Sequence, residues 1–336
     1  MLKRTSQLVL TASLLLTSLL TACGPAGQPL QGMRPALQQF STQRRSPVRN
    51  ADWFAALPPN LQQYYAPARG KTGKDLLLAL HQIISQGTVV TEYGPAKSFL
   101  YAEADHVTQG NQSGVFDAYS YAFIPGSGGD GNTYREPGDL NRDGQPGDFI
   151  NLEHTWPQSF FAKITPMVSD MHHMFPTLSK PNAMRNNYPI GMATGTVVYT
   201  TSGGAKLGAV DKTGHHSPAE TTKLFNLPWE QQPHDVIQND FEVSFEPPDR
   251  QKGNTARALL YFYTRYFDQN IRQGGYDERA FWDSKVPTLI QWSQLDVPDE
   301  LELNRHEAVA RKQRNRNPFI DIPNLGELIG AEALIK

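Results

Sequence analysis

A single cysteine, Cys23, follows an apolar leader, and this limits how the chain can be held together. A basic start and an apolar run from Leu8 to Leu20 predict a lipoprotein-type signal peptide over residues 1–22. That run is shorter than the about 20 residues that span a membrane. We expect Cys23 to carry a lipid, although an ordinary secretory signal with an incidental cysteine stays open. An exported domain without disulfides then depends on its core, or on a bound metal.

Composition divides the chain into a tether and one large domain. Residues 23–69 are predicted to form a flexible tether and N-terminal lead-in, followed by a domain over 70–325 and a tail over 326–336. The 27 glycines and 25 prolines indicate a loop-rich fold. A net charge of −2 gives no indication that the protein binds a polyanion. A local basic cleft in a nearly neutral protein would still be enough to bind one. We expect a monomer.

The hydrophobic pattern predicts a mixed fold with more helix than strand. Apolar residues at helical spacing indicate helices over Gly73–Gly87 and Asn254–Ile271, the second capped by Asn254 or Thr255. A charged helix is predicted over Asp299–Asn317, and a strand over Gly195–Gly203. A strand, a turn and a short helix near Asn182–Asn187 are expected within "VSDMHHMFPTLSKPNAMRNNYPIG".

The stretch "NLEHTWPQSFF" places Glu153 directly before His154 and ahead of an apolar run. Glu is a hard oxygen ligand for a divalent cation, and a neutral His suits a general base. Neighbours on a strand point to opposite faces, so one could face a cation and the other an attacking water. Alone, the pair is better explained by an ordinary, partly exposed strand with a hydrogen-bonded His. Asn182 offers a neutral oxygen ligand that could complete a Mg²⁺ site.

Four blocks occur in order: "NLEHTWPQSFF", "SDMHHMFPTLSKPNAMRNNYPIG", "FEPPDRQKGNTARALLYFYTRY" and "RNRNPFIDIP". Together they closely resemble the bacterial endonuclease I family of secreted nucleases over roughly residues 70–325. The resemblance implies an α+β fold in which a ββα-metal (His-Me finger) core is embedded in a mixed, largely helical domain. It also implies hydrolysis of phosphodiester bonds with Mg²⁺, or Mn²⁺ or Ca²⁺, and products with 5′-phosphate and 3′-hydroxyl ends.

The resemblance also implies roles for single residues. Glu153 and Asn182 match the metal ligands, and His154 matches the general base. Some family members carry a cysteine-bonded insertion with a phosphate-contacting Arg, but only about fifteen residues lie between the Glu-His pair and the next block here. That Arg has no clear counterpart, and we expect Arg185 or Lys163 to contact the phosphate. The residues expected to support the site are Asp170, His172, His173 and Asn187.

These observations predict a metal-dependent, sequence-nonspecific exported endonuclease. We expect it to hydrolyse DNA and also RNA. The alternatives are an extracellular ribonuclease on the same scaffold and a non-catalytic nucleic-acid-binding lipoprotein. The protein is expected at the cell envelope, anchored in the membrane through Cys23, or outside the cell.

Three other patterns carry weaker hypotheses. "DLNRDGQPGDFI" matches the opening of a calcium loop at Asp139, Asn141 and Asp143, but Ile150 stands where the bidentate Glu should be. A simple Asp/Gly-rich turn is favoured, and the alternative is a structural Ca²⁺ that uses Asp148 instead. A zinc site at His215, His216 and His234 lacks a suitably spaced partner. The arginines of Arg305–Phe319 suit a phosphate-facing stripe or a solvated helix face equally.

Overall fold

The computed structural model describes residues 53–127, 134, 150–273 and 277–335. Contacts along the chain separate Met1–Ser46 from Pro47–Lys336, and the described residues belong to the second unit. The predicted leader, Cys23, and the proposed calcium ligands Asp139, Asn141 and Asp143 lie outside the described residues. Within the described part, no helix is both long and apolar enough to cross a membrane.

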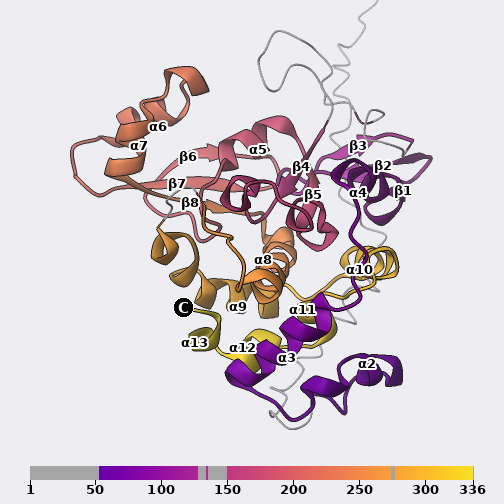
Figure 1. Cartoon of the computed structure of the whole chain (residues 1–336). Coiled ribbons are helices and arrows are strands. Elements are labelled where there is room, and N and C mark those ends of the chain that lie inside the picture. The colour runs from indigo at the N-terminus through magenta and orange to yellow at the C-terminus, as the bar shows by residue number, and fades with distance from the viewer. Residues whose placement is uncertain (1–52, 128–133, 135–149, 274–276, 336) are drawn as a thin grey trace, which may run out of the picture. The chain divides into compact units, whose positions relative to one another are not determined.

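The described unit is an α+β fold, as predicted, with three small antiparallel sheets among many helices (Figure 1). The first sheet has the order β1-β2-β3, the second is the pair β4-β5, and the third has the order β6-β7-β8. The strands are β1 (Val107–Gln109), β2 (Gln112–Phe116), β3 (Phe123–Pro125), β4 (Asn151–His154), β5 (Met174–Thr177), β6 (Thr196–Thr200), β7 (Lys206–Asp211) and β8 (Phe241–Glu246). The α-helices are α2 (Pro59–Tyr64), α3 (Gly73–Ser85), α4 (Tyr93–Phe99), α5 (Ser179–Arg185), α6 (Pro218–Phe225), α7 (His234–Asp240), α8 (Lys252–Tyr266), α9 (Val286–Leu295), α10 (Glu300–Gln313), α11 (Pro318–Asp321), α12 (Leu325–Ile329) and α13 (Ala331–Leu334).

The long amphipathic segments form the expected helices, with shifted ends. Helices α3, α8 and α10 lie within or close to the three predicted ranges, and β6 lies within the predicted strand. The predicted cap of α8 is wrong. Its N-cap is Gln251, because a 3₁₀ turn over Asp249–Gln251 runs directly into the helix. Thr255 is instead a buried residue within the helix.

The packed unit extends beyond the predicted 70–325 at both ends. Trp53, Leu57 and Tyr65 are buried in the main core, so the lead-in is part of the domain from Trp53 onward. Leu328 and Leu334, in the segment predicted as a tail, are buried in the same core. Because α12 and α13 both pack against α3, the C-terminal helices close the core beside it (Figure 1).

Helix α8 lies in the middle of this core and supports β4 through the residues that follow the strand. Trp156 is 1% exposed, stacks on Phe262 of α8 at 5.2 Å between ring centroids, and donates from Nε1 to the Ile271 carbonyl at 3.0 Å. Phe161 lies beside Phe262 as well. The apolar run after the Glu-His pair therefore anchors the end of β4.

Candidate active site

The Glu-His pair lies on β4, which pairs with β5 in antiparallel register. Glu153 is opposite Phe175 and His154 is opposite Met174. Helix α5 follows β5 after one intervening residue and packs against β4. Two antiparallel strands and one helix therefore bring Glu153, His154 and Asn182 into one small unit, although 27 residues of chain lie between the last two in sequence.

His154 is held by a backbone carbonyl through one ring nitrogen. The residue is 5% exposed, and its Nε2 lies 3.0 Å from the carbonyl oxygen of Val168. A carbonyl oxygen only accepts, so Nε2 carries the proton in the neutral ring and Nδ1 carries the lone pair. No hydrogen bond within the described part of the chain engages Nδ1. This arrangement suits a general base whose free nitrogen accepts a proton.

The surroundings of His154 keep its ring neutral. Burial is the largest influence, and together with the positive charges of Arg185 and Lys163 it lowers the pKa of His154 to about 4, although the Val168 carbonyl opposes the shift. Tyr93 of α4 stacks on the ring, with 5.8 Å between ring centroids and 25° between the planes. No sequence pattern pointed to Tyr93, because it lies 61 residues upstream of His154, at the start of α4.

Glu153 leaves β4 in a different direction and is 2% exposed. Its Oε1 lies 3.2 Å from Nε of Arg185, but the two groups are not aligned for a hydrogen bond. Burial raises the pKa of Glu153, and the Arg185 charge and the nearby Tyr119 hydroxyl oppose the rise. The Tyr119 hydroxyl is also outside hydrogen-bond geometry. Glu153 Oε1 is thus a buried carboxylate oxygen without a hydrogen-bond donor among the described residues.

Asn182 lies in the middle of α5 and is partly exposed. Its backbone belongs to the helix, but no hydrogen bond to another described residue occupies its side-chain amide. A carboxylate oxygen without a donor and an amide oxygen on an adjacent element are the hard ligands that Mg²⁺ takes, with water and substrate phosphate completing its shell. The residues present therefore fit the metal that the family resemblance implies.

The two residues expected to contact phosphate have different environments. Arg185 is buried, and its guanidinium donates to the backbone carbonyls of His154, Thr155 and Asn186. These internal contacts favour a role in fixing β4 over the predicted phosphate contact. Lys163 is exposed, and its charge acts on His154. Lys163 is therefore the better placed of the two for a phosphate.

Asp170 is the centre of a buried hydrogen-bond network behind His154. Its Oδ2 accepts from Nη1 of Arg265 at 2.5 Å, from Tyr266 at 2.8 Å and from Tyr261 at 2.9 Å. Its Oδ1 accepts from Gln313 at 2.8 Å. The network joins α8 and the end of α10 to the turn that begins at Met167 and carries Val168. Asp170 therefore fixes the segment whose carbonyl orients His154.

His172 and His173 are buried and bonded to backbone carbonyls. Nε2 of His172 lies 3.2 Å from the Asn315 oxygen, and Nε2 of His173 lies 2.8 Å from the Met167 oxygen. Burial is the largest cause that lowers the pKa of each to about 3. Both rings are therefore neutral, and each donates from Nε2 to a backbone carbonyl and so ties down the neighbouring segment. The fourth expected supporting residue, Asn187, is exposed just after α5.

The aromatic residues of α8 are core, as expected, and two of them serve the network as well. Tyr261 and Tyr266 are buried, and both donate to Asp170. Gln313 and Asn315, which also join the network, come from the charged C-terminal segment and were not predicted. Single amides in a charged helix give no pattern that separates them from solvated residues.

The proposed zinc histidines do not gather into one site. His216 pairs with Asp240 at 2.9 Å, His234 packs on Trp229 with 4.1 Å between ring centroids, and His215 is exposed. One His-Glu-Asp group, formed by His306, Glu307 and Asp321, does lie within metal-binding reach. The Arg316 guanidinium binds all three side chains, so a cation already holds that position.

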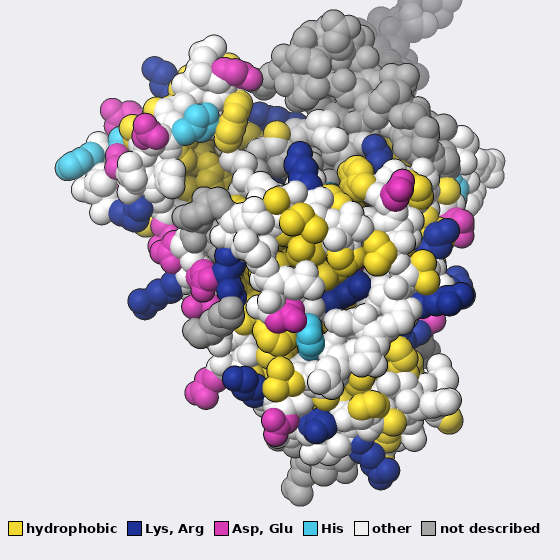
Figure 2. Space-filling model, viewed as in Figure 1, with side chains coloured by type: hydrophobic (Ala, Val, Ile, Leu, Met, Phe, Trp, Pro, Cys, Tyr) yellow, Lys and Arg dark blue, Asp and Glu magenta, His cyan; other side chains and the backbone are white. Residues whose placement is uncertain are grey.

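Two of the four arginines in the predicted basic stripe are engaged in ion pairs. Arg305 is buried and pairs with Asp105 at 2.7 Å, and Arg316 pairs with Asp321 at 2.7 Å. These contacts favour a structural role for Arg305 and Arg316, whereas Arg311 and Arg314 are exposed. On the face seen in Figure 2, basic side chains are interspersed with acidic and apolar ones and form no continuous basic patch.

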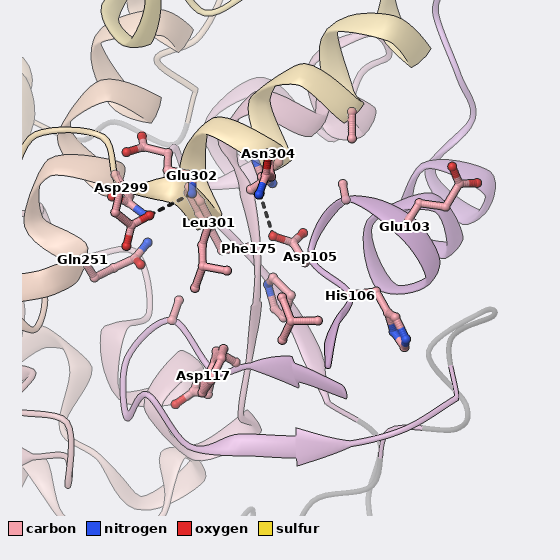
Figure 3. Close-up of a pocket in the computed structure, with 18 of the residues that line it drawn as sticks. Glu103, Asp105, His106, Asp117, Phe175, Gln251, Asp299, Leu301, Glu302 and Asn304 are labelled. Carbon is pink, nitrogen blue, oxygen red and sulfur yellow. Dashed lines mark hydrogen bonds and ion pairs between the residues drawn. The ribbon is translucent and has the colours of Figure 1, made fainter. Parts of the chain in front are cut away.

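A 340 Å³ hollow lies beside Phe175 of β5, where charged side chains from several elements meet (Figure 3). Several of its charged groups have partners. Asp105 accepts from Arg305, Glu302 binds Arg257, and Asp299 caps α10 by accepting from the Glu302 amide at 2.9 Å. These contacts give Asp105, Glu302 and Asp299 structural roles, whereas Glu103 and Arg311 in the same lining are exposed.

Comparisons with known proteins identify the family of the chain. The family model of Endonuclease I matches residues 72–223 and 231–324. An extracellular ribonuclease of Bacillus subtilis is 28% identical over 277 residues, which cover 79% of this chain and 77% of that protein. An extracellular ribonuclease of Bacillus amyloliquefaciens is 26% identical over 279 residues, 80% of this chain and 78% of that protein. The chain therefore belongs to the endonuclease I family and is a nuclease that hydrolyses phosphodiester bonds.

Proposed function

We propose that this protein is a metal-dependent, sequence-nonspecific exported endonuclease with its catalytic centre on β4, β5 and α5. One observation carries the proposal. His154 is fixed through Nε2 and leaves Nδ1 as the acceptor, on the residue next to a buried carboxylate oxygen without a hydrogen-bond donor. In this proposal the three elements form the ββα-metal core.

Glu153 and Asn182 are the proposed metal ligands, and Mg²⁺ is the proposed ion. When bound, such a cation supplies positive charge that offsets the negative charge developing on the phosphate and on the leaving 3′ oxygen. The ligand set is small, which is ordinary for Mg²⁺ sites that also bind substrate phosphate. Mn²⁺ and Ca²⁺ prefer the same oxygen donors.

The chain's own residues supply the remaining steps. His154 accepts a proton from the attacking water at Nδ1, while the Val168 carbonyl keeps the ring in the required tautomer. Tyr93 restrains the ring by stacking on its face. Lys163 offers its ammonium group to the scissile phosphate, and Arg185 fixes the backbone of β4 from behind.

The substrate range follows from the groups that the centre contacts. A site that reads phosphate and sugar has no direct means of distinguishing bases, so cleavage should show little sequence preference. Both DNA and RNA are proposed substrates, and the names of the two Bacillus relatives favour RNA as one of them. Cleavage is proposed to leave 5′-phosphate and 3′-hydroxyl ends. Export, with a lipid on Cys23, is proposed from the leader sequence and the extracellular relatives.

The test is cleavage of plasmid DNA and of a structured RNA by the purified mature protein. We expect both to be degraded with Mg²⁺, and we expect activity to vanish in EDTA and to return when Mg²⁺ is added in excess. Undiminished cleavage in EDTA after prior dialysis against the chelator would overturn the metal-dependent mechanism. Cleavage of RNA alone would replace the proposed substrate range with that of a ribonuclease.

A further inference from the structure

A groove of about 760 Å³ begins where the active-site helix ends. Asn186, Asn187 and Tyr188, which follow α5, line one side of it. Phe160, six residues beyond His154, also lines it. Asn186 caps α5, and its backbone amide donates to the Asn182 carbonyl at 3.0 Å, so the groove begins next to the backbone of the proposed metal ligand.

The lining of the groove also includes an exposed aromatic pair. Trp229 is 54% exposed, in the loop between α6 and α7, and its ring lies 4.1 Å from that of His234 between centroids. Helix α7, which begins at His234, packs against β8 and so joins the pair to the sheet (Figure 1). A Trp that is more than half exposed is only partly packed by the protein, so it leaves aromatic surface that a flat ligand can contact.

The groove is rich in aromatic and amide groups but poor in cations. Lys212 is the one Lys or Arg among its described lining residues. The carboxylate of Glu242 lies 3.5 Å from the Lys285 ammonium, and Asp277 accepts from the Arg279 amide at 2.9 Å. A track for a phosphate backbone needs several cations, whereas aromatic faces and amides recognise nucleobases by stacking and hydrogen bonding.

We infer that this groove is a nucleobase subsite, in which an unpaired base of the substrate strand stacks on Trp229 beside the scissile phosphate. The inference rests on the proposed nuclease function of β4 and α5. It predicts a preference for single-stranded or locally unpaired nucleic acid, because a base within a duplex cannot reach the aromatic face. Stacking tolerates every base, so it agrees with cleavage at many sequences.

The test is steady-state cleavage of a short single-stranded oligonucleotide and of the matching duplex, with wild type, Trp229→Ala and Trp229→Phe. Loss of one base–aromatic stacking contact should raise KM for the single strand by about 5- to 150-fold in Trp229→Ala. The kcat should stay unchanged, cleavage of the duplex should be unaffected, and Trp229→Phe should restore most of the affinity. Leu295→Ala is the control, because Leu295 is 75% exposed and does not line the groove.

A second arm identifies the base. Abasic substitution at successive positions of the oligonucleotide should raise KM at one position for wild type, with no further rise at that position for Trp229→Ala. If wild type cleaves but Trp229→Ala keeps the wild-type KM, or loses activity equally on the duplex, the subsite is refuted while the nuclease function stands. If wild type cleaves neither substrate with Mg²⁺, the proposed function itself fails.

Discussion

Replacement of His154 with alanine is expected to lower kcat by about 10²–10⁴-fold on DNA and RNA alike, the usual contribution of a positioned general base. The expectation follows from the geometry of the ring, whose Nε2 is tied to Val168 and whose Nδ1 is the remaining acceptor. Cleavage rates at saturating substrate and Mg²⁺ measure the effect. KM should change little, because the side chain acts on water and not on the nucleic acid.

His215→Ala is the matched control for this variant. His215 is exposed in a loop, so its removal should leave kcat within about twofold of wild type. Because His154 is buried, circular dichroism must show that His154→Ala is folded, and added imidazole offers a second readout. Partial recovery of the rate with imidazole, in the variant alone, is expected if the missing group is a base. Wild-type activity in a folded His154→Ala protein would exclude His154 as the base.

Replacement of Asp170 with alanine is expected to lower the free energy of unfolding by about 3–5 kcal/mol, the cost of leaving one charge of a buried ion pair alone. Here the stranded group is the Arg265 guanidinium, and two tyrosine hydroxyls lose an acceptor as well. Urea unfolding measures the change. The control Asp249→Ala, whose side chain is 97% exposed, should change stability by about 1 kcal/mol or less.

The same carboxylate predicts how acid weakens the fold. Burial alone would raise the pKa of Asp170, but Arg265 and the surrounding hydrogen bonds outweigh it and hold the pKa well below the ordinary 3.8. A depressed pKa contributes stability that is present above the unfolded value and is lost as pH falls below it. Wild type should therefore lose stability steeply below about pH 4. Asp170→Asn should lose less over that range, and an equal loss in both proteins would contradict the role of Asp170.

Sequence patterns predicted the local secondary structure of those candidate-site residues that lie in short, continuous segments. Glu153 and His154 lie on a strand end because an apolar run follows them, and Trp156 anchors that run against α8 as expected. The helix with Asn182 follows its strand as predicted, although it begins at Ser179 and not near Asn182. Local spacing is enough to place such residues, since each is positioned by its own strand or turn.

Residues that reach the site through tertiary contacts were not predictable in this way. Tyr93 meets His154 only because α4 packs on the turn that begins at Met167. Gln313 meets Asp170 across 143 residues of chain. Arg185 shows the opposite case, in which the position in the helix was predicted but not the direction of the guanidinium. Its guanidinium donates to the backbone carbonyls of His154 and Thr155 at the end of β4. Buried carbonyls need a hydrogen-bond donor, but the sequence does not show which carbonyls the fold buries.

The central claim is that Glu153 and Asn182 hold a cation while His154 handles the proton, and a Mg²⁺ titration of the single-turnover cleavage rate tests it most directly. We predict that Asn182→Ala and Glu153→Gln shift the half-maximal Mg²⁺ concentration upward by about tenfold or more. We predict that His154→Ala lowers the rate at saturation and leaves that concentration unchanged. The account would be contradicted if the two ligand variants titrated as wild type does, or if His154→Ala shifted the Mg²⁺ dependence while keeping the full maximal rate.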